Sequence, residues 1–383
     1  MLRYITAGES HGKCMLAVVE GFPAGVCIDL EAINNELRRR QGGVGRGPRM
    51  GIEKDEVEIL SGIRKGVTLG SPICMRIENK DSSIDQLPEL TSARPGHADL
   101  AGAMKYGFHD MRNVLERSSA RETAARVAAG ALAGTLLNEF GIKAIGYVRG
   151  IGGVMDDTPA QDLDPEDIRR LRDSSGTYCL DKGAEERMTK RIKEAADAGD
   201  SVGGLIEVTV YGVPPGLGSS AQWDQRLDGR LASAVMSVQA MKGVEIGLGF
   251  QVAERPGSEV HDCIYYDEKS RGESLTGGFY RKTNRAGGLE GGVTNGEPVV
   301  VRAAMKPIPT LRKSLESVDL STKKTSPAAA ERSDVCAAPA ASVVVEAVVS
   351  FEIAKAFMEK FGGDSIQETG RNLKGYLKQV RGL

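Results

Sequence analysis

The chain has 383 residues, of which 40% are hydrophobic, and its formal net charge is −2. This length allows one large core or two moderate ones, and the hydrophobic fraction is ordinary for a soluble globular protein. A net charge so near zero gives no whole-molecule attraction for nucleic acid, so nucleic-acid binding is not expected and any positive potential must be local. Glycine is abundant, with 48 residues and no collagen-like period, which indicates many tight turns and backbone close to ligands.

The six cysteines are widely spread and show neither a C-x-x-C pair nor a Cys/His ligand spacing. We therefore expect free thiols in a reducing compartment and predict no metal site. The N-terminus has no apolar signal region, and no apolar run of about 18 residues occurs. A soluble cytoplasmic protein without a membrane segment is expected.

The first part of the chain predicts two short strands and a helix that ends in arginines. Residues 2–7 and 14–20 are the expected strands, separated by the sequence GESHG at 8–12. Asp29 is predicted to cap a helix over 31–40. That helix ends in three arginines and leads into the glycine-rich loop QGGVGRGPRM.

A β-hairpin is predicted next, over 56–63 and 73–78, followed by a polar loop at 79–93. The stretch 94–130 then combines an irregular segment with the start of a long helix over about 118–140. Ser119 would lie in its first turn, where free backbone N–H groups and a partial positive charge suit a phosphate. The many alanines of this helix imply close packing against another element and hence a central position.

The second half alternates strands and helices around two irregular sections. Strands are expected at 142–151, 204–212, 243–252 and 298–304, and helices at about 164–173, 184–199, 225–240 and 340–360. The polar section 155–201 is predicted to be a peripheral excursion, 268–295 to be a long functional or disordered loop, and the basic tail 371–383 to be an amphipathic helix. The order strand, turn, small-residue helix, strand occurs in both halves and suggests an internal two-fold resemblance.

Two local motifs have alternative interpretations. GESHG fits the G-x-S-x-G nucleophile elbow of a serine hydrolase, with Ser10 as nucleophile, but the residues after Gly12 predict a strand where the elbow requires a helix. The arginines of RRRQGGVGRGPR fit a solvated helix end, an RNA-binding patch or a site for a small polyanion. No aromatic residue lies between them to stack bases, and arginine suits carboxylates and phosphates, so the small polyanion is favoured.

Histidines and nucleotide fingerprints narrow the choice further. His97 follows Pro95-Gly96 and is better placed than His109 or His261, to which no role is assigned. No dinucleotide fingerprint and no P-loop occurs, so NAD and ATP are not implied.

Seven motifs occur along the chain: AGESHG, RRRQGGVGRGPRM, RPGHAD, ERSSARETAARVAAGA, NRAGGLEGG, KPIPT and RSD…AP. In this order they resemble the chorismate synthase family from residue 1 to about 365. The resemblance implies a single α+β domain over 1–383, with 155–201 and the tail 366–383 outside the motifs. Its fold would be a β-α-β sandwich, with two antiparallel sheets around a helical core and internal pseudo-two-fold symmetry.

The resemblance also implies an activity and its requirements. The family eliminates phosphate from 5-enolpyruvylshikimate 3-phosphate by a 1,4-anti route to give chorismate, the last step of the shikimate pathway in aromatic amino acid biosynthesis. It needs reduced FMN without net redox change, and the enzyme is a homotetramer. Because no NAD(P)H motif is visible, an external flavin reductant is expected rather than bound NADP(H).

Site residues follow from the same resemblance. His11 would give a proton to the leaving phosphate, His97 would protonate reduced flavin, and Asp334 would lie beside flavin N5. Substrate contacts are implied for Ser10, His11, Arg40, Arg46, Arg94 and Arg332. Cofactor contacts are implied for His97, Ser119, Ala120, Asn284, Ala286, Lys306, Thr310, Arg332, Ser333 and Asp334.

Overall fold

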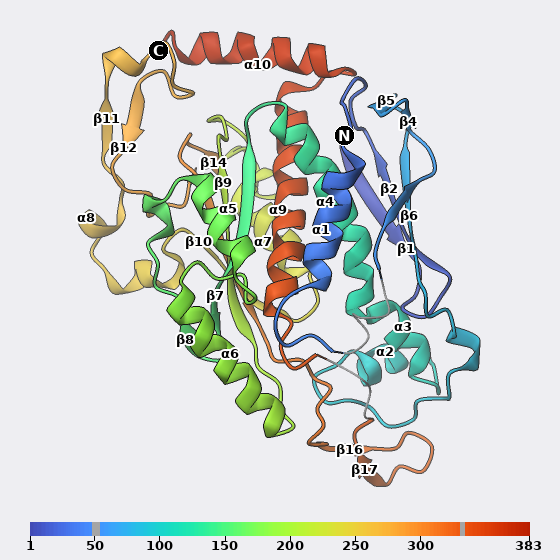
Figure 1. Ribbon diagram of the computed structural model, residues 1–383. Helices are drawn as coiled ribbons and strands as arrows, with labels where there is room; N and C mark the ends of the chain where they lie inside the picture. The colour runs from blue at the N-terminus through green and yellow to red at the C-terminus, as the bar shows by residue number, and fades with distance from the viewer. Residues whose placement is uncertain (48–53, 330–333) are drawn as a thin grey trace.

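Residues 1–47, 54–329 and 334–383 are described by a computed structural model, in which two antiparallel sheets enclose a group of helices (Figure 1). The first sheet has four strands in the order β1 (Arg3–Ala7), β2 (Cys14–Glu20), β6 (Ile73–Glu78) and β3 (Val57–Ile59). The second has five, in the order β10 (Met241–Ile246), β15 (Val299–Met305), β9 (Gly204–Tyr211), β7 (Lys143–Ile151) and β8 (Val154–Met155). The α+β class with antiparallel sheets is therefore confirmed.

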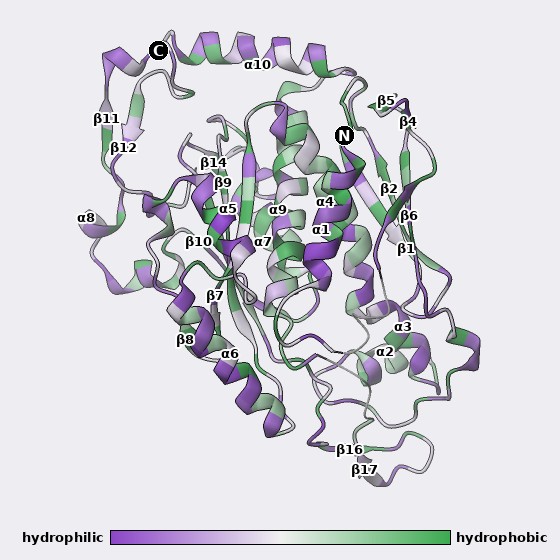
Figure 2. Cartoon of the chain, in the orientation of Figure 1, coloured by the Kyte–Doolittle hydropathy of each residue, from purple (hydrophilic) through white to green (hydrophobic). Residues whose placement is uncertain are grey.

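Two helices fill the space between the sheets. α4 (Thr123–Asn138) packs on β2 and β6, α9 (Ala338–Phe361) packs on β7 and β9, and the two helices pack on each other. α4 is rich in alanine and leucine and α9 in alanine and valine, and both are largely green or white in Figure 2. They pack closely at Gly130, where an added Cβ would lie 2.4 Å from the Cβ of Ala347. The central position predicted for the alanine-rich helix is confirmed.

Further helices complete the core and its surroundings. α1 (Leu30–Gln41) packs on α4 and α9, and its N-cap Asp29 accepts from the N–H groups of Glu31 and Ala32 as predicted. α7 (Leu227–Met236) packs between α9 and β10, while α5 (Pro165–Ser174) and α6 (Lys182–Asp197) lie against β7. The short helices are α2 (Asp99–Tyr106), α3 (Arg112–Ser118) and α8 (Gly257–Val260).

The remaining elements are small hairpins and a terminal helix. The two-stranded pairs are β4 (Ile63–Arg64) with β5 (Val67–Thr68), β11 (Ile264–Tyr266) with β12 (Phe279–Arg281), β13 (Leu289–Glu290) with β14 (Val293–Thr294), and β16 (Glu316–Val318) with β17 (Thr325–Pro327). α10 (Ile366–Val380) runs across one end of the molecule toward the β11–β12 hairpin (Figure 1). No helix in the described ranges combines the length and the apolarity needed to cross a bilayer.

Four predicted elements need correction. The helix expected from about 118 begins at Thr123, because Ser119 is extended (φ −61°, ψ 145°) and separates α3 from a 3₁₀ turn at Ala120–Glu122. The strand expected to 252 ends at Ile246, where Gly247 takes φ +60° and a 3₁₀ helix follows. The hairpin after 56 is interrupted by β4 and β5, and the loop 268–295 contains β12, β13 and β14.

Candidate active site

A cavity of about 560 Å³ opens beside the first turns of α9, and this size is ordinary for a small-molecule site. Nine of the residues predicted to hold substrate or cofactor line it: Arg40, Arg46, Arg94, His97, Ser119, Ala120, Lys306, Thr310 and Asp334. They come from the end of α1, the segment before α4, the chain after β15 and the segment before α9. Apolar side chains, among them Met305, Ile308 and Val344, form the rest of the wall.

Two of the arginines are held by one buried carboxylate. Asp55 is 1% exposed and accepts from Arg40 and Arg121 at 2.5 Å each. Burial opposes ionisation of Asp55, but the two guanidinium groups outweigh it and hold its pKa below the usual range. Arg40 Nε is buried and has no hydrogen-bond partner within the described residues.

The same network reaches the histidine turn at 8–12. Asn79 accepts from Arg121 Nε at 2.8 Å and donates to the carbonyls of Glu9 and Gly12 at 3.0 and 2.8 Å. Its side chain is therefore hydrogen-bonded on both sides. Asn79 and Asp55 fix the turn and the arginines relative to each other, although neither residue lies in one of the seven motifs.

His97 is paired with a buried carboxylate and an arginine. Its Nδ1 lies 2.5 Å from Oδ1 of Asp99, which is fully buried, and Arg94 Nε donates to Asp99 Oδ2 at 2.8 Å. Burial alone would raise the pKa of Asp99, but the hydrogen bonds from His97 and Arg94 outweigh it and place the pKa far below its usual range. Asp99 stays ionised and fixes both side chains, and Arg94 NH1 also donates to Thr310 at 3.1 Å.

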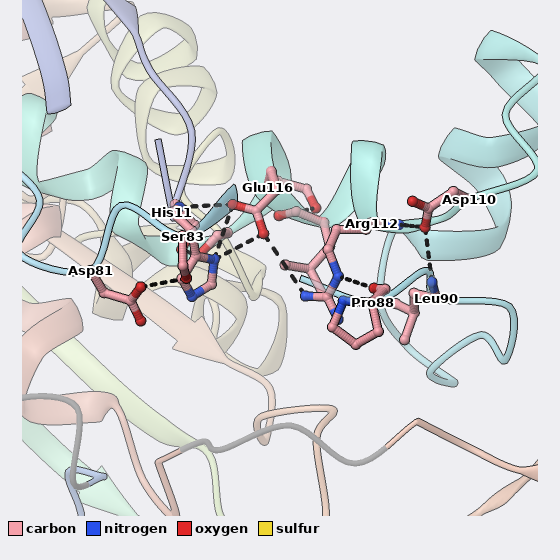
Figure 3. Close-up of polar contacts among 12 residues, drawn as sticks. His11, Asp81, Ser83, Pro88, Leu90, Asp110, Arg112 and Glu116 are labelled. Atoms are coloured by element: carbon pink, nitrogen blue, oxygen red, sulfur yellow. Dashed lines mark hydrogen bonds and ion pairs between the residues drawn. The ribbon is translucent and has the colours of Figure 1, made fainter. Parts of the chain in front are cut away.

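Ser10 and His11 do not line the cavity, but Ser10 is hydrogen-bonded to one of its lining residues. The hydroxyl of Ser119 donates to that of Ser10 at 3.2 Å, which connects the turn to the cavity. His11 is bound to Glu116 of α3, as Figure 3 shows. The turn runs into strand β2, where a nucleophile elbow would need a helix, so the structure argues against a serine hydrolase.

Asp334 and Lys306 are each held by a contact to another segment of the chain. Asp334 forms an ion pair with Arg46 and accepts from the N–H of Gly47 at 2.6 Å. Lys306 Nζ donates to the carbonyl of Gly96, and burial, together with the nearby Lys242, lowers its pKa. Arg332 and Ser333, for which substrate and cofactor contacts are predicted, lie outside the described residues.

Asn284 and Ala286 do not line this cavity. The Asn284 amide donates to the carbonyl of Pro298 at 2.8 Å and accepts from Gly288 at 2.7 Å, so it stabilises its own loop. Ala286 N–H donates to Asp262. Their assignment to the cofactor stays a prediction.

The structure adds wall residues that the motifs did not indicate. Gln239 and Ala240, which follow α7, face the cavity, and Gln239 donates to Glu122 at 3.2 Å. Asp55 and Asn79, which lie outside the motifs, act behind the wall. So does Glu116, which begins the motif ERSSARETAARVAAGA but has no role implied for it. A buried acid near a histidine or arginine is a common arrangement, but which acid is near depends on the tertiary fold and has no spacing signal in the sequence.

Charge at the site favours an anionic ligand. Among the described residues, the wall has five cations, Arg40, Arg46, Arg94, Arg121 and Lys306. The four arginines are paired with three carboxylates, Asp55, Asp99 and Asp334, whereas Lys306 donates to a backbone carbonyl. The excess is local, because the whole chain has a net charge of −2. A cavity with an apolar wall and surplus guanidinium groups can bind a ligand that carries phosphate and carboxylate groups.

Comparisons with known proteins agree with this site. The family model described as chorismate synthase matches residues 2–358. The chain is 56% identical to proteins named chorismate synthase from Pelobacter propionicus and from Geobacter sulfurreducens, over the full length of each. It also matches a solved structure titled "Crystal Structure of Chorismate Synthase" with a TM-score of 0.81 and 42% identity, covering 100% of this chain and 99% of that one. The chain belongs to the chorismate synthase family.

Proposed function

We propose that this chain eliminates phosphate from 5-enolpyruvylshikimate 3-phosphate to give chorismate, the last step of the shikimate pathway. The observation that carries the proposal is the gathering of nine motif residues, from Arg40 to Asp334, around one cavity with excess positive charge. Family membership makes the chain a lyase that acts on a phosphate. The substrate has one phosphate and two carboxylates, and the guanidinium groups of Arg40, Arg46 and Arg94 are suited to bind them.

The cavity also fits the cofactor that the family resemblance implies. Reduced FMN has a flat apolar ring system and an anionic phosphate, and the cavity offers both an apolar wall and fixed cations such as Lys306. We propose that His97, Ser119, Ala120, Lys306, Thr310 and Asp334 hold FMN, together with Asn284, Ala286, Arg332 and Ser333. When bound, reduced FMN would supply electron density to the allylic system without net redox change.

Each titratable group then has a task. His11 gives a proton to the leaving phosphate, which otherwise departs with more negative charge. His97 holds a proton toward the cofactor, and its position is fixed by Asp99 at 2.5 Å. Asp334 lies in the cavity wall, where it would assist the bound cofactor in taking the proton that leaves the substrate ring, and it forms an ion pair with Arg46.

The wider setting follows the resemblance. We propose a homotetramer located in the cytoplasm, served by an external flavin reductant. We propose as well that the two sheets and the helices between them form a β-α-β sandwich with internal pseudo-two-fold symmetry.

The test is anaerobic phosphate release with dithionite-reduced FMN. Wild type should release phosphate from 5-enolpyruvylshikimate 3-phosphate only while FMN is reduced. His11→Ala and His97→Ala should each lose about 10²- to 10⁴-fold in rate, which is the usual contribution of a positioned acid or base. Phosphate release that is indifferent to flavin reduction would contradict the proposal.

The serine hydrolase alternative is tested in the same assay. A hydrolase would lose activity in Ser10→Ala and would keep it when flavin is omitted. The proposed lyase should lose all turnover without FMN.

A further inference from the structure

The turn that carries His11 is attached to one residue of α3 at three points. Glu116 Oε2 accepts the backbone N–H of His11 at 2.8 Å, and Glu116 Oε1 lies 2.9 Å from His11 Nδ1. The carbonyl of Glu116 accepts the N–H of Ser10 at 2.9 Å. In Figure 3 the carboxylate of Glu116 lies directly beside the imidazole ring of His11.

These contacts determine which nitrogen of the His11 ring can exchange a proton with a ligand. A carboxylate can only accept, so His11 Nδ1 must carry the hydrogen that bonds it. His11 Nε2 is then the nitrogen left to exchange a proton with a ligand. The side chain of Glu116 is 3% exposed and that of His11 15%, so water competes little for this bond.

The other charged groups nearby do not replace Glu116 in this contact. Arg112, on α3, reaches Glu116 Oε1 only at 4.0 Å and donates its Nε–H to the carbonyl of Pro88 at 2.8 Å. Asp81, in the loop opposite, accepts from Ser83 at 2.6 Å. Within the described part of the chain, the short side-chain contacts of the Glu116 carboxylate go to His11, and Arg112 adds a more distant positive charge that favours the ionised form.

We propose that Glu116 is the positioning residue for His11: it sets the Nδ1–H tautomer and the ring orientation, and it stabilises the charged imidazolium. This inference rests on the proposed role of His11 as the acid for the leaving phosphate. The arrangement parallels that of His97 with Asp99, so each of the two histidines assigned to proton transfer has its own buried carboxylate. The logic is that of the acid member of a catalytic triad, which orients a histidine without reacting.

A double-mutant cycle tests the proposal. We expect Glu116→Gln to lower kcat on the order of 10²-fold with KM changed little, because the amide presents an N–H to a ring nitrogen that must donate. In the His11→Ala background, Glu116→Gln should cost less than about twofold, because the group it acts through is gone. Losses that multiply in the double variant would overturn the proposal, since they would mean that Glu116 supports the fold rather than His11.

Two further variants test whether the negative charge of Glu116 is what matters for kcat. Glu116→Asp keeps the charge but is one methylene shorter, so it should recover part of the kcat lost in Glu116→Gln. Glu58→Gln makes the same chemical change on a surface side chain that pairs with Arg76, and it should keep wild-type kcat and KM. Equal losses in Glu116→Asp and Glu116→Gln would contradict a role for the charge.

A measurement on the wild type does not depend on any variant of Glu116 folding. With ¹⁵N-labelled histidine, the resonances of His11 are identified as those missing from a His11→Gln sample. Neutral His11 should show a protonated Nδ1 and an unprotonated Nε2. The opposite tautomer would overturn the proposal, whereas an active His11→Ala enzyme with the expected tautomer would instead contradict the proposed role of His11.

Discussion

Asp55 contributes both to the substrate site and to the stability of the molecule. Its two oxygens neutralise Arg40 and Arg121, and all three side chains are at least nine-tenths buried. Such a triad is costly to break, because removing the anion leaves two largely buried guanidinium groups without their counter-ion.

Asp55→Asn should lower the free energy of unfolding at neutral pH by about 3–5 kcal/mol. The pKa of Asp55 is depressed in the folded state, so its contribution is complete above the unfolded value of about 3.9 and is lost as the pH falls toward the folded value. Wild type should therefore lose more stability than Asp55→Asn as the pH falls below about 4. Urea unfolding over a pH series measures this, and parallel pH dependences in the two proteins would contradict it.

The sequence identified some residues of the site and gave no role to others. Arg40, His97 and Lys306 belong to motifs that the sequence alone identifies, and they do line one cavity. Asp55 lies outside the motifs, and Glu116 begins one of them without an implied role. The partner of neither could be assigned, because a carboxylate pairs with whichever cation the fold brings within reach. Arg40 and Asp55 are 15 positions apart in the chain, whereas Glu116 and His11 are 105 positions apart.

Among the helices and strands, the packing of α4 on α9 joins the half of the core beside β2 and β6 to the half beside β7 and β9. Gly130 lies at the contact with Ala347, while Gly134, one turn later on α4, has no atom within 4 Å of an added Cβ. The two glycines therefore offer a matched pair of sites in one helix, with the same chemical change and opposite surroundings.

Gly130→Ala should destabilise the protein by about 1–3 kcal/mol, because the new methyl group would lie 2.4 Å from both the Cβ and the carbonyl oxygen of Ala347. Gly134→Ala should be neutral or stabilise by up to about 1 kcal/mol, because alanine restricts the unfolded chain and favours helix. Urea midpoints of the two variants give the comparison. A Gly130→Ala protein as stable as Gly134→Ala would show that the helices can move apart at no cost.

Elements with a strong hydrophobic period were predictable, and those set by tertiary contacts were not. β2, β9 and α1 lie within a residue or two of their predicted bounds. The helix predicted to begin at about residue 118 is interrupted by the extended backbone of Ser119, and α4 begins at Thr123. The residue types around Ser119 do not reveal this interruption. The short pairs such as β11 with β12 were hidden because glycine and polar residues dominate that stretch.

At the scale of the whole molecule, α9 separates the cavity from α10. Its 24 residues span about 36 Å, with the cavity at its first turns and α10 beyond its last (Figure 1). α10 is tied at one end by the N–H of Ile366, which donates to Ala24, and at the other by the carbonyl of Arg381, which accepts from Arg271. It thus connects the loop after β2 to the β11–β12 hairpin.

Removal of residues 366–383 should loosen the hairpin and leave the cavity intact. Amide hydrogen exchange over 264–281 should accelerate, because a two-stranded hairpin is marginal without a packing partner. FMN and substrate binding should change by less than about twofold, since neither end of α10 reaches the cavity. Exchange measured by mass spectrometry, with ligand titration as the control, tests both parts, and loss of binding with unchanged exchange would contradict the prediction.

The cavity wall also has a consequence for how the enzyme is made. Its residues come from the end of α1, the chain before α4, residues 238–240, the chain after β15 and the start of α9, so nearly the whole polypeptide separates the first from the last. Contacts this remote in sequence are slow to form, because long loops must close first. During synthesis on the ribosome, the cavity cannot form until α9 has emerged. A nascent or truncated chain that lacks α9 is therefore expected to have no partial activity.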